Sequence, residues 1–95
     1  MKIYIAGRIT GDEQAKEKFK AAEEMLTKQN HVVLNPVKNI GFDYKEYIDM
    51  GLCELSKCEA IYILKGWEQS KGAVLEHHYA NVVGMQVIYE EEREI

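Results

Sequence analysis

Three residues that could do chemistry together, Ser70, Gly72 and Glu76, follow the apolar run Ala60–Leu64. The order predicts a buried strand, a polar loop and then a helix that carries a carboxylate. In open α/β sheets ligands bind beyond the carboxyl ends of the strands, and the amides at a helix N-terminus attract anions. Gly72 and Glu76 share one helix face, which aims the carboxylate toward that turn. This stretch is therefore the first candidate for a site.

Each of these features also has a purely structural explanation. A serine before a helix is commonly an N-cap, and a glutamate near a helix N-terminus gains less than about 1 kcal/mol from the helix dipole. Taken alone, Glu76 favours the structural explanation. Phe42 and Tyr44, upstream of the third strand, are candidates for an aromatic lid over a base and equally for core residues.

Strand and helix patterns alternate along the whole chain. They predict one α/β domain over residues 1–95, a three-layer Rossmann-like or flavodoxin-like fold with helices on both faces of the sheet. Right-handed crossovers give a four-stranded parallel sheet in the order 2-1-3-4. The predicted strands are Lys2–Ala6, His31–Leu34, Glu59–Leu64 and Gln86–Tyr89. Strands 1 and 3 then meet at the switch point, which brings the loop Gly7–Gly11 beside Ser70–Glu76.

Local signals set the helix limits. Thr10 and Glu13 have the spacing of a capping box, which predicts that the first helix begins at once. The second helix is expected over Tyr44–Cys58, where Gly51 costs about 1 kcal/mol relative to Ala. A glycine there marks either a close approach by a ligand or partner or the loss of a functional side chain. The acidic tail Glu90–Ile95 is expected to be solvated.

Composition excludes several classes of function. The chain has 95 residues and a formal net charge of -4, which argues against a nucleic-acid partner but leaves a small anionic ligand possible. The two cysteines, Cys53 and Cys58, point apart on a helix and fit a reducing, cytoplasmic location. No apolar run is long enough for a bilayer, so no membrane partner is expected. Adjacent His77 and His78 diverge by about 100° on a helix, and neither a metal nor a cofactor is predicted.

Three segments of the sequence resemble the nucleoside 2-deoxyribosyltransferase superfamily. The resemblance is closest to its small 2'-deoxynucleoside 5'-phosphate N-hydrolases and their short bacterial and phage-type relatives. The segments are residues 3–11, residues 47–59 and Ser70-x-Gly72-x-x-x-Glu76. The resemblance implies that Glu76 is the nucleophile and that Tyr4 lies near it. It also implies a nucleotide and phosphate cradle made of Tyr4, Gly7, Arg8, Ile9, Thr10, Ser70 and Gly72.

Two positions depart from the superfamily pattern. Members usually carry an Asp on the helix before the third strand and a second Asp eight residues later, and these positions hold Gly51 and Glu59 here. The remaining candidates for the acid that protonates the leaving base are Glu59, with its longer side chain, and Asp49, two residues before the glycine.

The resemblance implies a reaction like that of retaining glycosidases, in which Glu76 attacks a deoxyribose and a covalent glycosyl-enzyme forms. The product is free base, released by hydrolysis or by transfer of the sugar to another base. The alternative is a nucleotide-binding module that keeps the pocket without catalysis, and a third hypothesis is an interaction subunit. The small four-stranded sheet leaves exposed edges, which predicts a homodimer or larger homo-oligomer.

Overall fold

The computed structural model describes residues 1–38 and 41–90 and contains a four-stranded parallel sheet. The strand order is β2-β1-β3-β4, which confirms the predicted topology. In chain order the elements are β1 (Lys2–Ala6), α1 (Ala15–Lys28), β2 (Val32–Leu34), the 3-10 turn η1 (Pro36–Lys38), α2 (Tyr44–Ser56), β3 (Ala60–Ile63), the 3-10 turn η2 (Trp67–Gln69), α3 (Lys71–Val83) and β4 (Gln86–Tyr89).

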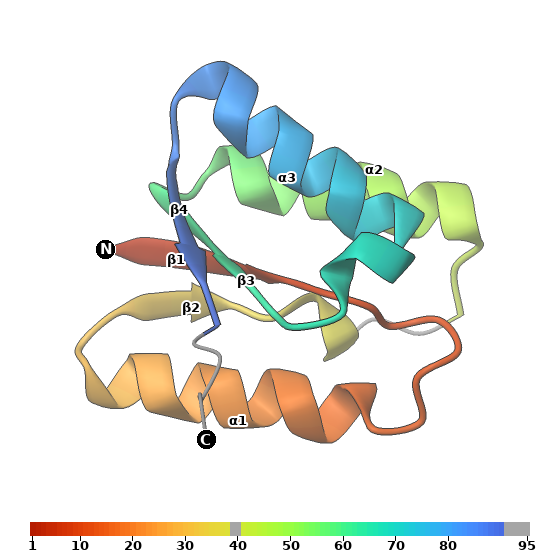
Figure 1. Cartoon of the computed structure of the whole chain (residues 1–95), viewed down its shortest axis with the longest axis horizontal. Coiled ribbons are helices and arrows are strands. Elements are labelled where there is room, and N and C mark those ends of the chain that lie inside the picture. Colours follow the sequence, from red (N-terminus) through yellow and green to blue (C-terminus); the bar gives the residue numbers. More distant parts are fainter. Residues whose placement is uncertain (39–40, 91–95) are drawn as a thin grey trace.

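Helices cover both faces of this sheet, as Figure 1 shows: α1 lies on one side, while α2 and α3 lie side by side on the other. The register of the two central strands pairs Tyr4 with Ile61 and Ala6 with Ile63. Both strands therefore end at the same edge of the sheet. The loops that follow them, Gly7–Gly11 and Lys65–Ser70, meet at that edge and frame the site.

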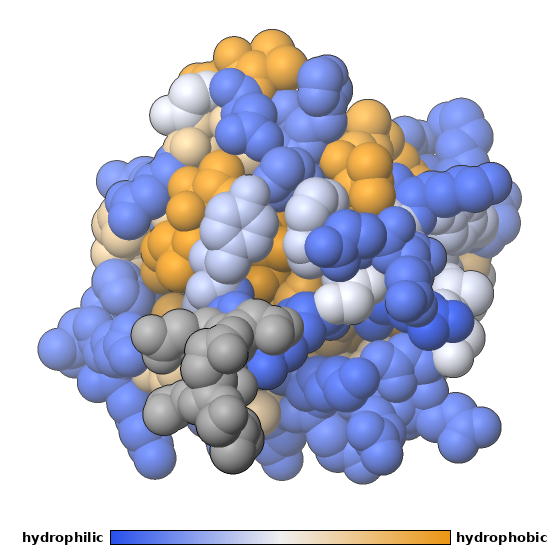
Figure 2. Space-filling view, viewed as in Figure 1, coloured by the Kyte–Doolittle hydropathy of each residue, from blue (hydrophilic) through white to orange (hydrophobic). Residues whose placement is uncertain are grey.

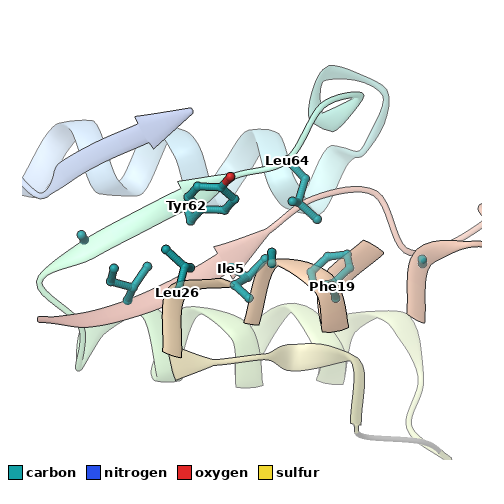
Figure 3. Packing of buried hydrophobic residues seen from close by; sticks show 9 residues of the cluster. Ile5, Phe19, Leu26, Tyr62 and Leu64 are labelled. Carbon is teal, nitrogen blue, oxygen red and sulfur yellow. The ribbon is translucent and has the colours of Figure 1, made fainter. Parts of the chain in front are cut away.

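Alternation along β1 divides the core into two clusters. Ile3 and Ile5 pack with Phe19 and Leu26 of α1, together with Tyr62 and Leu64 from the neighbouring segment (Figure 3). Tyr4 and Ala6 point the other way, toward a second cluster that includes Leu55 of α2 and Ala80 of α3. Because side chains of a strand alternate between faces, the same five-residue strand builds a dry core on one side and the site on the other.

The capping prediction for the first helix is wrong. Helix α1 begins at Ala15, and no side chain caps it at Gln14. Asp12 instead accepts hydrogen bonds from the Gln14 backbone amide and from Lys18 Nζ, each at 2.9 Å. The capping box is found at α2, where the Asp43 side chain accepts from the Glu46 amide and the Glu46 side chain accepts from the Asp43 amide. A spacing of three residues is common in polar loops, and the longer loop after β1 moves the helix start downstream.

On the face shown in Figure 2, exposed apolar side chains gather over α3 and β4, whereas the α1 side is largely hydrophilic. The exposed residues of α3 are Val74, Leu75, Val82 and Val83. No helix in the described part of the chain is long and apolar enough to cross a membrane. Self-association stays a prediction.

Two further expectations concern the end of the chain and the paired histidines. Most of the predicted acidic tail, residues 91–95, lies outside the described residues, but Glu90 continues β4, because its amide donates to the Ile63 carbonyl at 2.7 Å.

His77 stacks on Trp67 with ring centroids 4.3 Å apart and its Nε2 lies 2.7 Å from the Tyr89 hydroxyl. This packing gives His77 a structural role between η2 and β4.

Candidate active site

A cavity of about 300 Å³ opens at the carboxyl edge of the sheet. Its walls come from three parts of the chain: β1 with the loop after it, one side of α2, and the first turns of α3. Pro36 and Val37 of η1 close the remaining side. A volume of this size is at the lower end of the range for small-molecule sites.

Glu76 lies inside this cavity and is 8% exposed. The Tyr4 hydroxyl, which is also buried, donates a hydrogen bond of 2.8 Å to Glu76 Oε2. Burial raises the pKa of Glu76 to about 7; the hydrogen bond from Tyr4 opposes that rise and the negative charge of Glu54 adds to it. Burial and the Glu76 charge also raise the pKa of Tyr4 far above its usual value, so Tyr4 remains a donor. The site thus holds an oriented carboxylate that changes charge near neutral pH.

Gly51 of α2 is packed directly against this pair. A Cβ atom at position 51 would lie 2.5 Å from Glu76 Oε2 and 2.8 Å from the Tyr4 hydroxyl oxygen. Real Cβ atoms essentially never come so close to another heavy atom. The packing shows a close approach at this glycine, but the approaching groups belong to the protein itself, where the sequence had suggested a ligand or partner.

The N-terminus of α3 forms the next part of the wall. Ser70 caps the helix, because its Oγ accepts a hydrogen bond of 3.1 Å from the Ala73 amide. Gly72 allows α2 to approach here as well, since a Cβ at this position would lie 2.8 Å from Ile48 Cδ1 and 3.6 Å from the Tyr44 hydroxyl oxygen. Ser70 and Gly72 both line the cavity, so the cap and the cavity wall share residues.

The loop after β1 supplies the facing wall through Gly7, Ile9 and Thr10. Arg8 is not a lining residue, and its guanidinium instead connects the two loops. Nε donates to the Thr10 carbonyl at 3.3 Å, and Nη1 donates to Gln69 Oε1 of η2 at 3.2 Å. Arg8 therefore links the two loops through hydrogen bonds, and its positive charge lies beside the opening.

The structure does not bring Glu59 or Asp49 into this cavity. Glu59 precedes β3, at the amino edge of the sheet, where its carboxylate accepts a hydrogen bond of 2.8 Å from the Lys2 amide. Asp49 is exposed on the outer side of α2 and pairs with Lys45 at 2.8 Å. The expectation that one of them approaches the leaving base is not met, because strand polarity separates the first and helix rotation separates the second from Glu76.

Glu54 is the lining carboxylate that the sequence analysis missed. It lies on α2, is partly buried, and adds negative charge that raises the pKa values of both Glu76 and Tyr4. Tyr47 and Met50 precede it along the same side of the helix and also line the cavity. The spacing of Glu54 from Gly51, three residues and about one turn, was the signal that could have found it.

The predicted aromatic lid is divided between two environments. Tyr44 lines the cavity while half of its surface is exposed, as expected for a residue at an opening. Phe42 is not a lining residue and packs edge-on against Tyr47, with ring centroids 6.2 Å apart. One member of the pair thus borders the site and the other supports its wall.

Comparisons with known proteins agree with this geometry at the level of the fold. A family model described as a domain of unknown function (DUF4406) matches residues 1–89. A 2-deoxyribosyltransferase from the psychrotolerant bacterium Bacillus psychrosaccharolyticus superposes with a TM-score of 0.73 at 20% identity, covering 99% of this chain and 77% of the other. One from Leishmania mexicana gives a TM-score of 0.74 at 20% identity, over 93% of this chain and 62% of the other. Among curated proteins, no sequence is similar enough to count as a match.

Proposed function

Because this chain belongs to the DUF4406 family and has the fold of 2-deoxyribosyltransferases, we propose that it cleaves the N-glycosidic bond of a 2'-deoxynucleoside 5'-monophosphate. The observation that carries the proposal is the buried Glu76 carboxylate, held by the Tyr4 hydroxyl inside a cavity that also contains the N-terminal turn of α3. Water or a second base then takes the sugar, so the reaction is hydrolysis or transfer.

Glu76 acts as the nucleophile in this proposal. One of its carboxylate oxygens attacks C1' of the deoxyribose while the base leaves with the electron pair of the C1'–N bond. The glycosyl ester that remains is opened by the acceptor, with net retention at C1'. The Tyr4 hydrogen bond fixes the orientation of the carboxylate before the substrate arrives, which reduces the entropy cost of reaching the reactive geometry.

The 5'-phosphate is assigned to the opening between the two loops. The first amides of an α-helix have no partner within the helix and attract anions, and the first turn of α3 forms the cavity wall at Gly72. Ser70 and Thr10, which carry hydroxyl groups, line the cavity on the two sides of this opening, and Arg8 adds positive charge beside it. A phosphate bound there places the sugar one helical turn further in, over Glu76.

The test is incubation of the purified protein with each deoxynucleoside 5'-monophosphate, with free base measured by chromatography. Replacing Glu76 with Gln is expected to reduce base release by about three orders of magnitude or more. Glu59→Gln is the matched control, since it makes the same chemical change at an exposed acid outside the cavity. No release from any of the four substrates, with a nucleotide still raising the melting temperature, would identify a binding module instead.

The pH dependence of base release provides a separate prediction. Glu76 must be ionised to attack, so kcat/KM is expected to rise with pH up to about 7. Tyr4→Phe removes the hydrogen bond that lowers the pKa of Glu76, so the rising limb should move to higher pH. Tyr47→Phe, which changes another cavity tyrosine without touching this hydrogen bond, should leave the limb in place. An unmoved limb in Tyr4→Phe would contradict the assignment to Glu76.

A further inference from the structure

The order of side chains along the cavity follows from how α2 and α3 pack. Position 72 of α3 contacts Ile48 of α2, and one turn later Glu76 contacts position 51. The two helices therefore run in the same direction along the cavity. Glu54 lies one further turn along α2, about 4.5 Å beyond Gly51 in the direction away from Gly72. Along the two helices, the cavity thus presents the first turn of α3, then Glu76, then Glu54.

A nucleotide bound as proposed has the same order of parts. Its phosphate lies at the first turn of α3, its sugar lies over Glu76, and its base extends toward Glu54. There the base meets Met50 as an apolar wall and the Glu54 carboxyl as the polar group. Neither the side chain of Glu54 nor that of Glu76 has an ion-pair partner among the described residues. No hydrogen bond from the described part of the chain occupies the Glu54 carboxyl.

We infer that Glu54 is the acid that protonates the departing base; this inference rests on the proposed function. The Glu54 carboxyl gives its proton to a ring nitrogen of the base as the C1'–N bond breaks and the bonding electrons remain on the base. At the same time a Glu76 oxygen bonds to C1'. Charge balances when the two carboxyl groups together hold one proton and that proton is on Glu54: the base leaves neutral, Glu54 becomes a carboxylate and the ionised Glu76 becomes a neutral ester.

This role requires the glycine at position 51. An acid placed there would have its Cβ 2.5 Å from Glu76 Oε2, inside the nucleophile's own space. An acid one turn further along the same side of α2 keeps the direction of its side chain and leaves Glu76 and Tyr4 in contact. The acid is thus displaced from the usual superfamily position and not lost.

The experiment compares two leaving groups in Glu54→Gln, Glu76→Gln and the unaltered protein. The substrates are 2'-deoxyguanosine 5'-monophosphate and its N7-methylated derivative, whose base is already cationic and leaves without needing a proton. Glu54→Gln is expected to slow release of guanine about 100-fold or more, within the usual range for general acid catalysis, and to change release of 7-methylguanine only a few-fold. Glu76→Gln should abolish both reactions.

Other outcomes overturn the inference in distinguishable ways. Equal losses on both substrates in Glu54→Gln would mean that the residue only shapes the cavity. Undiminished guanine release in that variant, or an unaltered protein that cleaves only the methylated substrate, would mean that no acid acts from position 54, while the proposed function stands. If the unaltered protein releases base neither from the methylated substrate nor from any of the four deoxynucleoside 5'-monophosphates, the proposed function and the inference both fail. Melting temperatures of the two variants check that each is folded.

Discussion

Glu76→Gln is expected to raise the free energy of unfolding by about 3 kcal/mol at pH 8 and to change it little at pH 4. The carboxyl group has a pKa of about 7 in the folded protein, against 4.5 for an exposed glutamate. Each pKa unit corresponds to 1.36 kcal/mol, and the difference of about 2.5 gives this magnitude.

The sign follows from where the proton is held. Below pH 4.5 both the folded and the unfolded chain carry the proton, so burial of Glu76 has no cost in charge. Between pH 4.5 and about 7 the unfolded chain releases the proton first, and the stability of the natural protein falls as pH rises. Above about 7 the folded protein holds a buried carboxylate. Glutamine has nearly the same shape and no charge, so the stability of the Glu76→Gln variant does not fall in this way as pH rises.

Urea denaturation at pH 4, 6 and 8 measures the effect. The curves of stability against pH for the natural protein and for Glu76→Gln should meet at low pH and separate as pH rises. Glu59→Gln, the exposed-acid control, should follow the natural protein. Parallel curves for all three would show that Glu76 is not the buried group that titrates. The same variant is the one expected to lose base release, so stability and activity should change in opposite directions.

Gly51→Ala is expected to reduce base release about 100-fold or more and to destabilise the fold. The added methyl carbon would lie 2.5 Å from Glu76 Oε2 and 2.8 Å from the Tyr4 hydroxyl oxygen, so either the pair separates or α2 moves outward. Overpacking of this kind costs about 1 to 3 kcal/mol, and the better helix propensity of alanine offsets about 1 kcal/mol. A displacement near 1 Å at reacting groups is enough for a loss of this size in rate.

Cys53→Ala is the control for Gly51→Ala. It introduces the same side chain two residues away, at an exposed position of the same helix. It should keep full activity and nearly full stability. Near-normal activity in Gly51→Ala would mean that α2 yields without disturbing Glu76, and the account of position 51 as a fixed close contact would be wrong.

The fold was predictable because local patterns and chain topology agree. Four short apolar runs alternate with amphipathic helices, and such chains have few acceptable arrangements. The meeting of Gly7 with Ser70 at one edge followed from strand order alone, and the structure places both around one cavity. The start of α1 was not predictable in the same way, because Thr10 and Asp43 both precede a glutamate by three residues and only the second forms a capping box.

The acid of the site was harder to find because it depends on the rotation and depth of α2. Counting positions from a related pattern led to Glu59 and Asp49, but counting does not include the packing that brings Gly51 against Glu76. Because α2 approaches Glu76 this closely, no side chain fits at position 51. The next residue of α2 that can reach the cavity from the same side lies one turn further along the helix. Glu54 looks like an ordinary helix glutamate in the sequence, and only its neighbours across the cavity distinguish it.

The two-sided core described for β1 has a consequence for how this protein can change. Ile3 and Ile5 belong to the cluster beneath α1, and Tyr4 and Ala6 belong to the cluster beside the cavity. The sheet thus separates a cluster that contributes to stability from the cluster that adjoins the candidate site. Stability lost to a buried acid on one side can be offset by better packing around Phe19 on the other, provided that Val37, which packs against the first cluster and lines the cavity, stays in place. Mutational drift or laboratory evolution can therefore alter the two properties separately, one face of the sheet at a time.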